Sequence, residues 1–186
     1  MKTIHLLSGL PASGKSYYLD NVIGEDAKHR ILHRDDVRAQ LREKLKSKEY
    51  FPVPSDKEYE AWMLACVSVI IAHPDAEHYY FDQTTLGNGS AAKFYNGLAL
   101  ALLGADIDIT DYMFCIDVMD TDLETCLERN DKREGFARVP DRILQNMAAA
   151  TPVDHRLRNQ INVVSLKNKY QYMEIYDIIE DERRRI

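Results

Sequence analysis

The segment from Gly9 to Ser16 constrains this chain most strongly, because it satisfies the pattern G-x-x-x-x-G-K-[ST]. An apolar run from Thr3 to Ser8 precedes it and predicts a short buried strand, and Lys15 to Asp20 predict the start of a helix. In that setting the backbone N–H groups of the loop and the N-terminus of the helix point at phosphate oxygens. A chance glycine-rich turn is the alternative, and the flanking elements favour the phosphate loop.

This loop predicts a nucleotide site for ATP with Mg²⁺. Lys15 is expected to contact the β and γ phosphates, and the Ser16 hydroxyl is expected to hold the Mg²⁺ ion. The other loop residues expected at the nucleotide are Gly9, Pro11, Ala12, Ser13 and Gly14.

Strand and helix patterns alternate along the rest of the chain. Further strands are predicted at His29–His33, Glu77–Phe81, Tyr112–Val118 and Ile161–Leu166. Helices are predicted at Asp35–Lys46, Ser55 to about His73, Ala91–Leu103, Thr121 to near Arg129, from Pro140 onward, and at about Tyr172–Glu180. This alternation predicts an α/β fold, with a parallel sheet covered on both faces and ligands at the carboxyl ends of the strands. We expect one domain over residues 1–186, since no repeat or linker divides the 186 residues.

Two details of the helices can be predicted more closely. Ser55 with Glu58, and Thr121 with Glu124, have the spacing of a capping box and predict where two helices begin. The helix from Ser55 has apolar residues all round, which predicts a buried helix in which Trp62 is a packing residue.

A carboxylate and an arginine follow the second predicted strand. Asp35 and Arg38 are three residues apart at the start of a helix, so both can face one cleft. The carboxylate could take the proton of an acceptor hydroxyl, and the guanidinium could bind an acceptor phosphate. On spacing alone, a capping Asp35 and a solvated Arg38 fit equally well. The phosphate loop favours the catalytic interpretation.

Asp82 stands at the end of the third predicted strand, where a carboxylate could support Mg²⁺ or the acceptor. A turn-forming aspartate at a strand exit is the alternative. Thr84 and Thr85 could donate hydrogen bonds to the same site.

Arginines recur in the charged segment after the fourth predicted strand. Arg129 and Arg133 are four residues apart, and about residues 130–139 could close as a lid that brings them to the transferred phosphoryl group. A solvated charged face is the simpler interpretation of such a segment, and the phosphate loop favours the lid.

Composition narrows the partners and the compartment. The net charge of −6 disfavours broad binding along nucleic acid, which depends on many Lys and Arg contacts, although recognition of a single end remains compatible. Cys66, Cys115 and Cys126 have no metal-like spacing and are expected to be reduced thiols in the core. No signal-peptide layout or membrane-spanning run is present in the sequence, so we expect a cytoplasmic protein without membrane contact. The oligomeric state is not predicted.

The motifs together resemble the polynucleotide 5′-hydroxyl kinases, in particular the kinase half of phage polynucleotide kinase-phosphatase, within the P-loop kinases. The resemblance rests on Gly9–Ser16, on Arg34–Arg38, on the Asp82 segment, and on Glu128–Arg133 followed by Val139-Pro140. It implies a three-layer P-loop kinase sandwich and transfer of the ATP γ-phosphate to a 5′-hydroxyl of DNA or RNA. By the same resemblance Asp35 is the general base, Arg38 binds the acceptor's phosphate, and Arg129 and Arg133 are lid arginines.

Four other functions are alternatives. Three of them are enzymes that share the same skeleton. They are a kinase of small, nucleoside-like alcohols, a phage kinase of hydroxymethylated DNA bases, and a toxin-like kinase of sugar nucleotides. A non-catalytic ATP-binding switch is an alternative of another class, which the presence of Asp35 and Arg38 disfavours.

Overall fold

A computed structural model of the chain describes residues 1–45, 55–84, 88–119, 121–150 and 164–165. Its centre is a sheet in the order β2-β3-β1-β4-β5. The strands are β1 (Lys2–Ser8), β2 (His29–His33), β3 (His78–Asp82), β4 (Tyr112–Val118) and β5 (Val164–Ser165). The first four are parallel, as predicted, and helices lie between strands that follow one another in the sequence.

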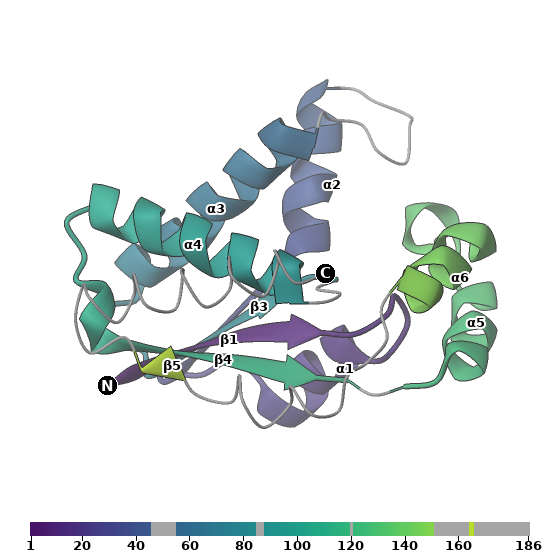
Figure 1. The fold of residues 1–186 in the computed structure, drawn as a ribbon, viewed down its shortest axis with the longest axis horizontal. Helices are drawn as coiled ribbons and strands as arrows, with labels where there is room; N and C mark the ends of the chain where they lie inside the picture. The colour runs from purple at the N-terminus through teal and green to yellow at the C-terminus, as the bar shows by residue number, and fades with distance from the viewer. Residues whose placement is uncertain (46–54, 85–87, 120, 151–163, 166–186) are drawn as a thin grey trace, which may run out of the picture.

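The sheet is covered by helices on both faces, and two further helices lie beyond the ends of its strands (Figure 1). On one face lie α2 (Arg34–Leu45), α3 (Ser55–Ala72) and α4 (Asn88–Gly104), and on the other lies α1 (Lys15–Tyr18), which continues as a π-helical turn over Leu19–Ile23. Beyond the strand ends are α5 (Leu123–Asp131) and α6 (Asp141–Ala150). Short 3₁₀ turns span Ile109–Asp111 and Gly135–Ala137.

The main core fills the space between the sheet and the α3–α4 layer. Ile4 and Leu6 of β1 point into it and meet Trp62, Phe81 and Phe94. Trp62 is fully buried and packs edge-on against Phe81, so its predicted packing role is confirmed. The alternate residues of β1 point to the other face, where Leu7 packs with Leu19 and Tyr80.

Most predicted elements are present, with three corrections. β5 pairs antiparallel to β4, so the predicted sheet is parallel only over its first four strands. α3 is not buried all round, because Leu64 and Ile71 are 68% and 54% exposed on its outer side. The predicted capping residue of α5 is also wrong: Asp122 is the N-cap and accepts a hydrogen bond from the Thr125 N–H at 2.7 Å.

Other predictions fall partly outside the described residues. Of the strand predicted at Ile161–Leu166, the structure describes Val164–Ser165, and the helix predicted near Tyr172–Glu180 lies outside. The side chain of Ser55 also lies outside, so its capping role stays a prediction. The three cysteines are free, with Cys66 and Cys126 buried and Cys115 half-buried. Among the described residues, no helix has the length and apolarity that crossing a membrane requires.

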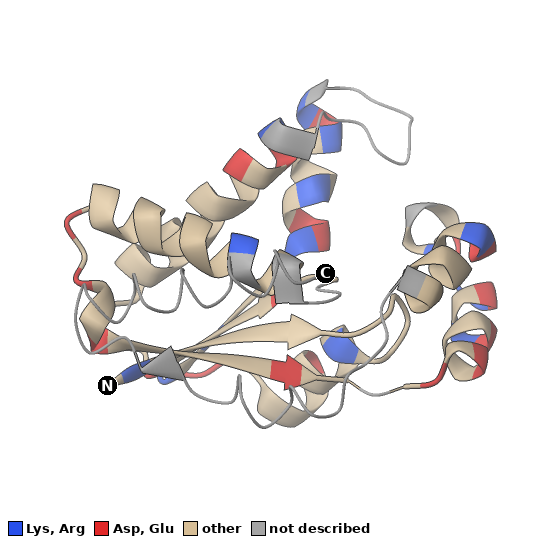
Figure 2. Ribbon diagram, in the orientation of Figure 1, with Lys and Arg blue, Asp and Glu red and all other residues tan. Residues whose placement is uncertain are grey.

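Charged side chains are unevenly distributed over this framework. Figure 2 shows few charges on the strands and along most of α4, whereas Lys and Arg recur on α2 and on the α5–α6 unit. Asp and Glu occur on the same helices, so charges of both signs border the region beyond the carboxyl ends of the strands.

The contact between α3 and α4 depends on a residue without a side chain. A Cβ atom at Gly97 would lie 2.0 Å from the Tyr59 Oη and 3.2 Å from the Met63 sulfur. Tyr59 cannot move away freely, since its hydroxyl donates to the Lys93 carbonyl at 2.7 Å. We therefore expect Gly97→Ala to lower the free energy of unfolding by about 1–3 kcal/mol through overpacking.

Urea unfolding measures this change, and Gly104→Ala at the end of the same helix is the matched control. A Cβ at Gly104 would meet nothing within 4 Å, so this variant should be neutral or slightly stabilising. Equal stabilities of the two variants would contradict the close approach of α3 and α4.

Candidate active site

The phosphate-binding loop leaves β1 at its carboxyl end and enters α1. Gly9 and Gly14 have φ angles of +149° and +102°, and Ala12 also has a positive φ of 63°. At Gly9 a side chain is excluded sterically as well, because a Cβ would lie 2.8 Å from the Ser13 Oγ and 2.9 Å from the Met119 carbonyl oxygen. The loop is therefore shaped by backbone geometry that glycine permits, which supports the prediction from the sequence pattern.

Lys15 is buried within this loop. Its Nζ donates to the carbonyls of Gly9 at 3.0 Å and Leu10 at 2.8 Å. Burial lowers the pKa of Lys15, and the nearby charge of Arg133 acts in the same direction, whereas Asp82 and Asp35 oppose it. Groups from three separate segments thus lie close enough to Lys15 to influence its charge.

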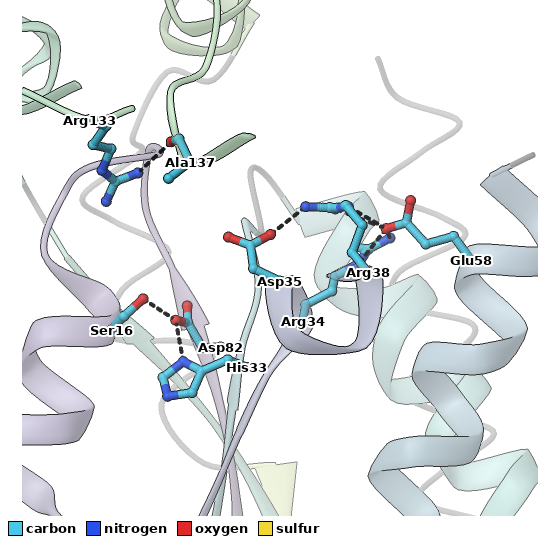
Figure 3. Close-up of polar contacts among 9 residues, drawn as sticks. All are labelled: Ser16, His33, Arg34, Asp35, Arg38, Glu58, Asp82, Arg133 and Ala137. Atoms are coloured by element: carbon cyan, nitrogen blue, oxygen red, sulfur yellow. Dashed lines mark hydrogen bonds and ion pairs between the residues drawn. The ribbon is translucent and has the colours of Figure 1, made fainter. Parts of the chain in front are cut away.

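Ser16 and Asp82 meet where α1 begins and β3 ends. The Ser16 hydroxyl donates to the Asp82 Oδ2 at 2.6 Å, and the His33 Nδ1 contacts the same oxygen at 2.9 Å (Figure 3). The other ring nitrogen of His33 lies 3.0 Å from the Asp20 Oδ1. The side chains form a continuous chain from Ser16 through Asp82 and His33 to Asp20.

The charges of this chain support one another. Burial opposes ionisation of Asp82, but the hydrogen bonds from His33 and Ser16, together with the charge of Lys15, outweigh it and lower the pKa of Asp82. The hydrogen bond to Asp82 raises the pKa of His33 to about 9, against the opposing effect of burial. At neutral pH the pair is therefore an imidazolium beside a carboxylate.

Asp35 and Arg38 lie across the cavity on α2. Arg38 forms an ion pair with Asp35, whose side chain is 86% exposed, and both line the cavity (Figure 3). Glu58 of α3 binds Arg38 and also Arg34. Its Oε1 accepts hydrogen bonds from the Arg38 Nη2 at 2.9 Å and from the Arg34 Nη2 at 3.0 Å. Burial opposes the charge of Glu58, but the two guanidiniums outweigh that effect and lower its pKa.

The other wall comes from α5 and the segment that follows it. The Ser13 carbonyl accepts hydrogen bonds from the Thr121 hydroxyl at 2.8 Å and from the Arg129 Nη1 at 3.3 Å. Arg133 follows the end of α5, and its Nη1 donates to the Ala137 carbonyl at 3.4 Å. Arg129 and Arg133 both line the cavity, and their action as part of a lid stays a prediction.

These groups surround one cavity of about 1000 Å³. Most of the predicted site residues line it: Pro11, Ala12, Gly14, Lys15, Ser16, Asp35, Arg38, Asp82, Arg129 and Arg133, with Thr84. Gly9 and Ser13 belong to the phosphate loop but do not line the cavity. Thr85 lies outside the described residues. Residues separated by more than a hundred positions in the sequence therefore meet at one place.

Sequence reasoning missed four side chains that organise this site. His33 and Asp20 extend the Ser16–Asp82 pair, Glu58 holds two arginines, and Thr121 contacts the phosphate loop. The sequence spacing instead predicts capping roles for Glu58 and Thr121. One sequence signal could have indicated the role of Glu58. It stands beside a long apolar run, and a carboxylate that is buried in such a place is expected to be paired with cations.

The donor set at Ser16 and Asp82 fits Mg²⁺. A hydroxyl and an ionised carboxylate are hard oxygen ligands, which Mg²⁺ prefers, and it usually takes its remaining ligands from water and substrate phosphates. Among the described residues, no cluster of three or more His, Cys, Asp or Glu side chains could hold a metal ion by itself.

Residues 4–152, most of the chain, match the protein family described as AAA domain. The chain belongs to this AAA domain family. No curated protein matches the chain. Membership assigns the phosphate loop, the α2 segment and the α5–α6 unit to the AAA domain, since all three lie within the matched residues.

Solved structures with a similar fold include three of interest. The "Pnkp1/Rnl/Hen1 RNA repair complex" contains a chain 17% identical to this one, which aligns over 88% of this chain and 48% of that chain with a TM-score of 0.56. A second structure of a Pnkp1/Rnl/Hen1 complex is 18% identical over 69% and 38%, with a TM-score of 0.51. A sugar kinase from Janibacter sp. HTCC2649 is 15% identical over 82% and 79%, with a TM-score of 0.52.

At such identities these likenesses concern the fold alone. The predicted P-loop kinase fold is confirmed for the AAA domain. The chain spans less than half the length of the two complex-forming chains.

The His33–Asp82 pair predicts a pH dependence. The folded-state pKa of His33 is about 9, above its ordinary value of 6.5, so the stabilisation by its cation is complete below pH 6.5. This stabilisation should be lost as the pH rises through about 9. An NMR titration of the His33 ring should give a midpoint near 9, and Asp82→Asn should move the midpoint downward.

The matching stability measurement is the urea midpoint between pH 6 and 9.5. His33→Gln should remove most of the decline with rising pH, whereas the control His73→Gln, at an exposed position, should retain it. A wild-type His33 midpoint near 6.5 would show that the pair is absent in solution.

Proposed function

We propose that this protein is an ATP-dependent kinase that transfers the γ-phosphate to an alcohol, namely the 5′-hydroxyl of DNA or RNA. One observation carries the proposal: the phosphate loop, with Lys15 and Ser16, faces the Asp35–Arg38 pair across a single cavity. The donor's phosphates and an acceptor hydroxyl can therefore be bound side by side, which is the main requirement of phosphoryl transfer.

The proposed mechanism assigns a task to each wall. Lys15 and the loop N–H groups neutralise and orient the triphosphate, and Mg²⁺, held by Ser16 and Asp82, would offset phosphate charge when bound. Asp35 takes the proton of the acceptor hydroxyl as its oxygen bonds to the γ-phosphorus, and the bond from phosphorus to the β-phosphate oxygen breaks to release ADP. Arg129 and Arg133 stabilise the charge on the transferring group.

The guanidiniums of α2 favour an anionic acceptor. Arg34 and Arg38 share one oxygen of Glu58, so two cations are held by a single buried carboxylate beside the cavity. Arg38 also pairs with Asp35, and a phosphate next to the reacting hydroxyl would give this guanidinium a further anionic partner that its geometry suits. A polynucleotide 5′ end supplies such a phosphate, whereas a free nucleoside or sugar does not.

The catalytic assignment predicts two distinct losses. Asp35→Asn should reduce transfer by about 10²–10⁴-fold through loss of the general base, with ATP affinity nearly unchanged. Lys15→Ala should abolish transfer through loss of phosphate contacts. Transfer of labelled γ-phosphate and ATP binding by calorimetry measure the two effects.

Glu43→Gln is a suitable control for Asp35→Asn, because it changes an exposed carboxylate on the same helix, outside the cavity. Wild-type turnover by Asp35→Asn would exclude Asp35 as the base. Intact ATP binding by the wild type without transfer to any acceptor would favour the non-catalytic switch.

The acceptor assignment predicts a selectivity that Arg38 controls. Among 5′-hydroxyl DNA, 5′-hydroxyl RNA, nucleoside 3′-phosphates, free nucleosides and DNA with hydroxymethylated bases, the first three should be labelled best. Arg38→Gln should lower transfer to phosphate-bearing acceptors on the order of 10-fold or more while affecting nucleosides less.

Labelling confined to free nucleosides, sugars or modified bases would retain the phosphate site and overturn the acceptor class. An equal effect of Arg38→Gln on nucleosides and on nucleoside 3′-phosphates would show that Arg38 does not contact the acceptor's phosphate.

A further inference from the structure

Asn130 is an unusual residue within α5. It is fully buried in the last turn of the helix, although its neighbours Arg129 and Asp131 are exposed. A buried amide is expected to have its hydrogen bonds satisfied. The partners of Asn130 therefore show what the residue does.

Both ends of the Asn130 amide bind the backbone of one distant residue. The Nδ2 donates to the Val139 carbonyl at 2.6 Å, and the Oδ1 accepts from the Val139 N–H at 3.0 Å. The Nδ2 also lies 3.3 Å from the Asp141 Oδ1 at the start of α6. The side chain thus joins the end of α5 to the beginning of α6.

This arrangement closes the segment 131–138 into a loop with joined ends. Arg133 lies inside that loop, whereas Arg129 precedes Asn130 on the helix. The backbone N–H of Arg133 donates to the Asn130 carbonyl at 3.0 Å, so Asn130 contacts the loop through its main chain as well. Val139, at the other end of the loop, is buried and lines the cavity.

We propose that Asn130 is a positioning residue for phosphoryl transfer: its amide holds the loop 131–138 closed and thereby places Arg133, but not Arg129, at the cavity. The inference rests on the proposed kinase function. It extends that function by assigning the placement of one arginine to a side chain that does not touch the substrate.

Only a side-chain amide can perform this task in the available space. Asparagine offers a donor and an acceptor side by side, which match the C=O and N–H of one residue. Aspartate keeps the acceptor and lacks the donor, and serine is too short to pair with both groups. An arginine displaced by about 1 Å can reduce turnover on the order of 100-fold, so a small relaxation of the loop is sufficient to lower the rate.

Double-mutant cycles test the proposal. Asn130→Asp and Asn130→Ser should lower kcat by about 10–100-fold and change the KM for ATP by less than about threefold. In an Arg133→Gln background the same changes should reduce kcat by less than about threefold further, because the arginine that they misplace is absent. In an Arg129→Gln background their full effect should persist.

Turnover is normalised to the stoichiometry of ATP binding, so that only folded molecules count, and thermal unfolding is recorded for each variant. Serine leaves room for water at the exposed backbone groups, so it provides a second variant if aspartate destabilises α5. Equal losses in the Arg133→Gln and Arg129→Gln backgrounds would overturn the proposal, as would unchanged kcat in both Asn130 variants. A wild type that binds ATP and labels no acceptor would instead reject the proposed function.

Discussion

The site depends on the parallel register of four strands. β1 lies between β3 and β4, and the pairings Leu7 with Asp82 and Ser8 with Val118 bring the carboxyl ends of these strands to one level. β2 pairs His33 with Asp82 at the same level. A slip of one residue in any pair would turn side chains to the opposite face. The contacts among Ser16, Asp82 and His33 therefore depend on the register of the sheet.

The carboxylates of the site differ in burial and in the number of their cationic partners. Asp82 and Glu58 are both buried, and each stays ionised because cationic groups from other elements surround it. Asp35 differs, since its side chain is largely exposed and contacts only one described cation, Arg38. The buried carboxylates organise their neighbours, whereas the exposed one remains accessible to an acceptor.

Most of the fold and most of the residues that line the cavity could be predicted from local patterns, whereas the supporting contacts could not. β4 has the predicted bounds, Tyr112–Val118, because a mostly apolar run between polar segments is a strong local signal. The cap of α5 was misplaced because Thr121 and Asp122 are both good capping residues, and the hydrogen bond from Thr121 to the phosphate loop, a contact between distant segments, decides between them. Likewise, spacing predicts a local capping role for Glu58, whereas its partners lie 20 and 24 residues away. The antiparallel pairing of β5 also depends on a contact that periodicity does not encode.

The residues of the site are far apart in the sequence, so ligand binding is coupled to folding. Lys15, Asp35, Asp82 and Arg129 come together only when the strands between them have paired. A partly folded chain therefore lacks the cavity, and a nucleotide can bind only the complete structure. By mass action, a ligand at 100 times its dissociation constant would stabilise such a state by about 2.7 kcal/mol. Nucleotide supply would then influence how long the protein survives proteolysis, apart from any turnover.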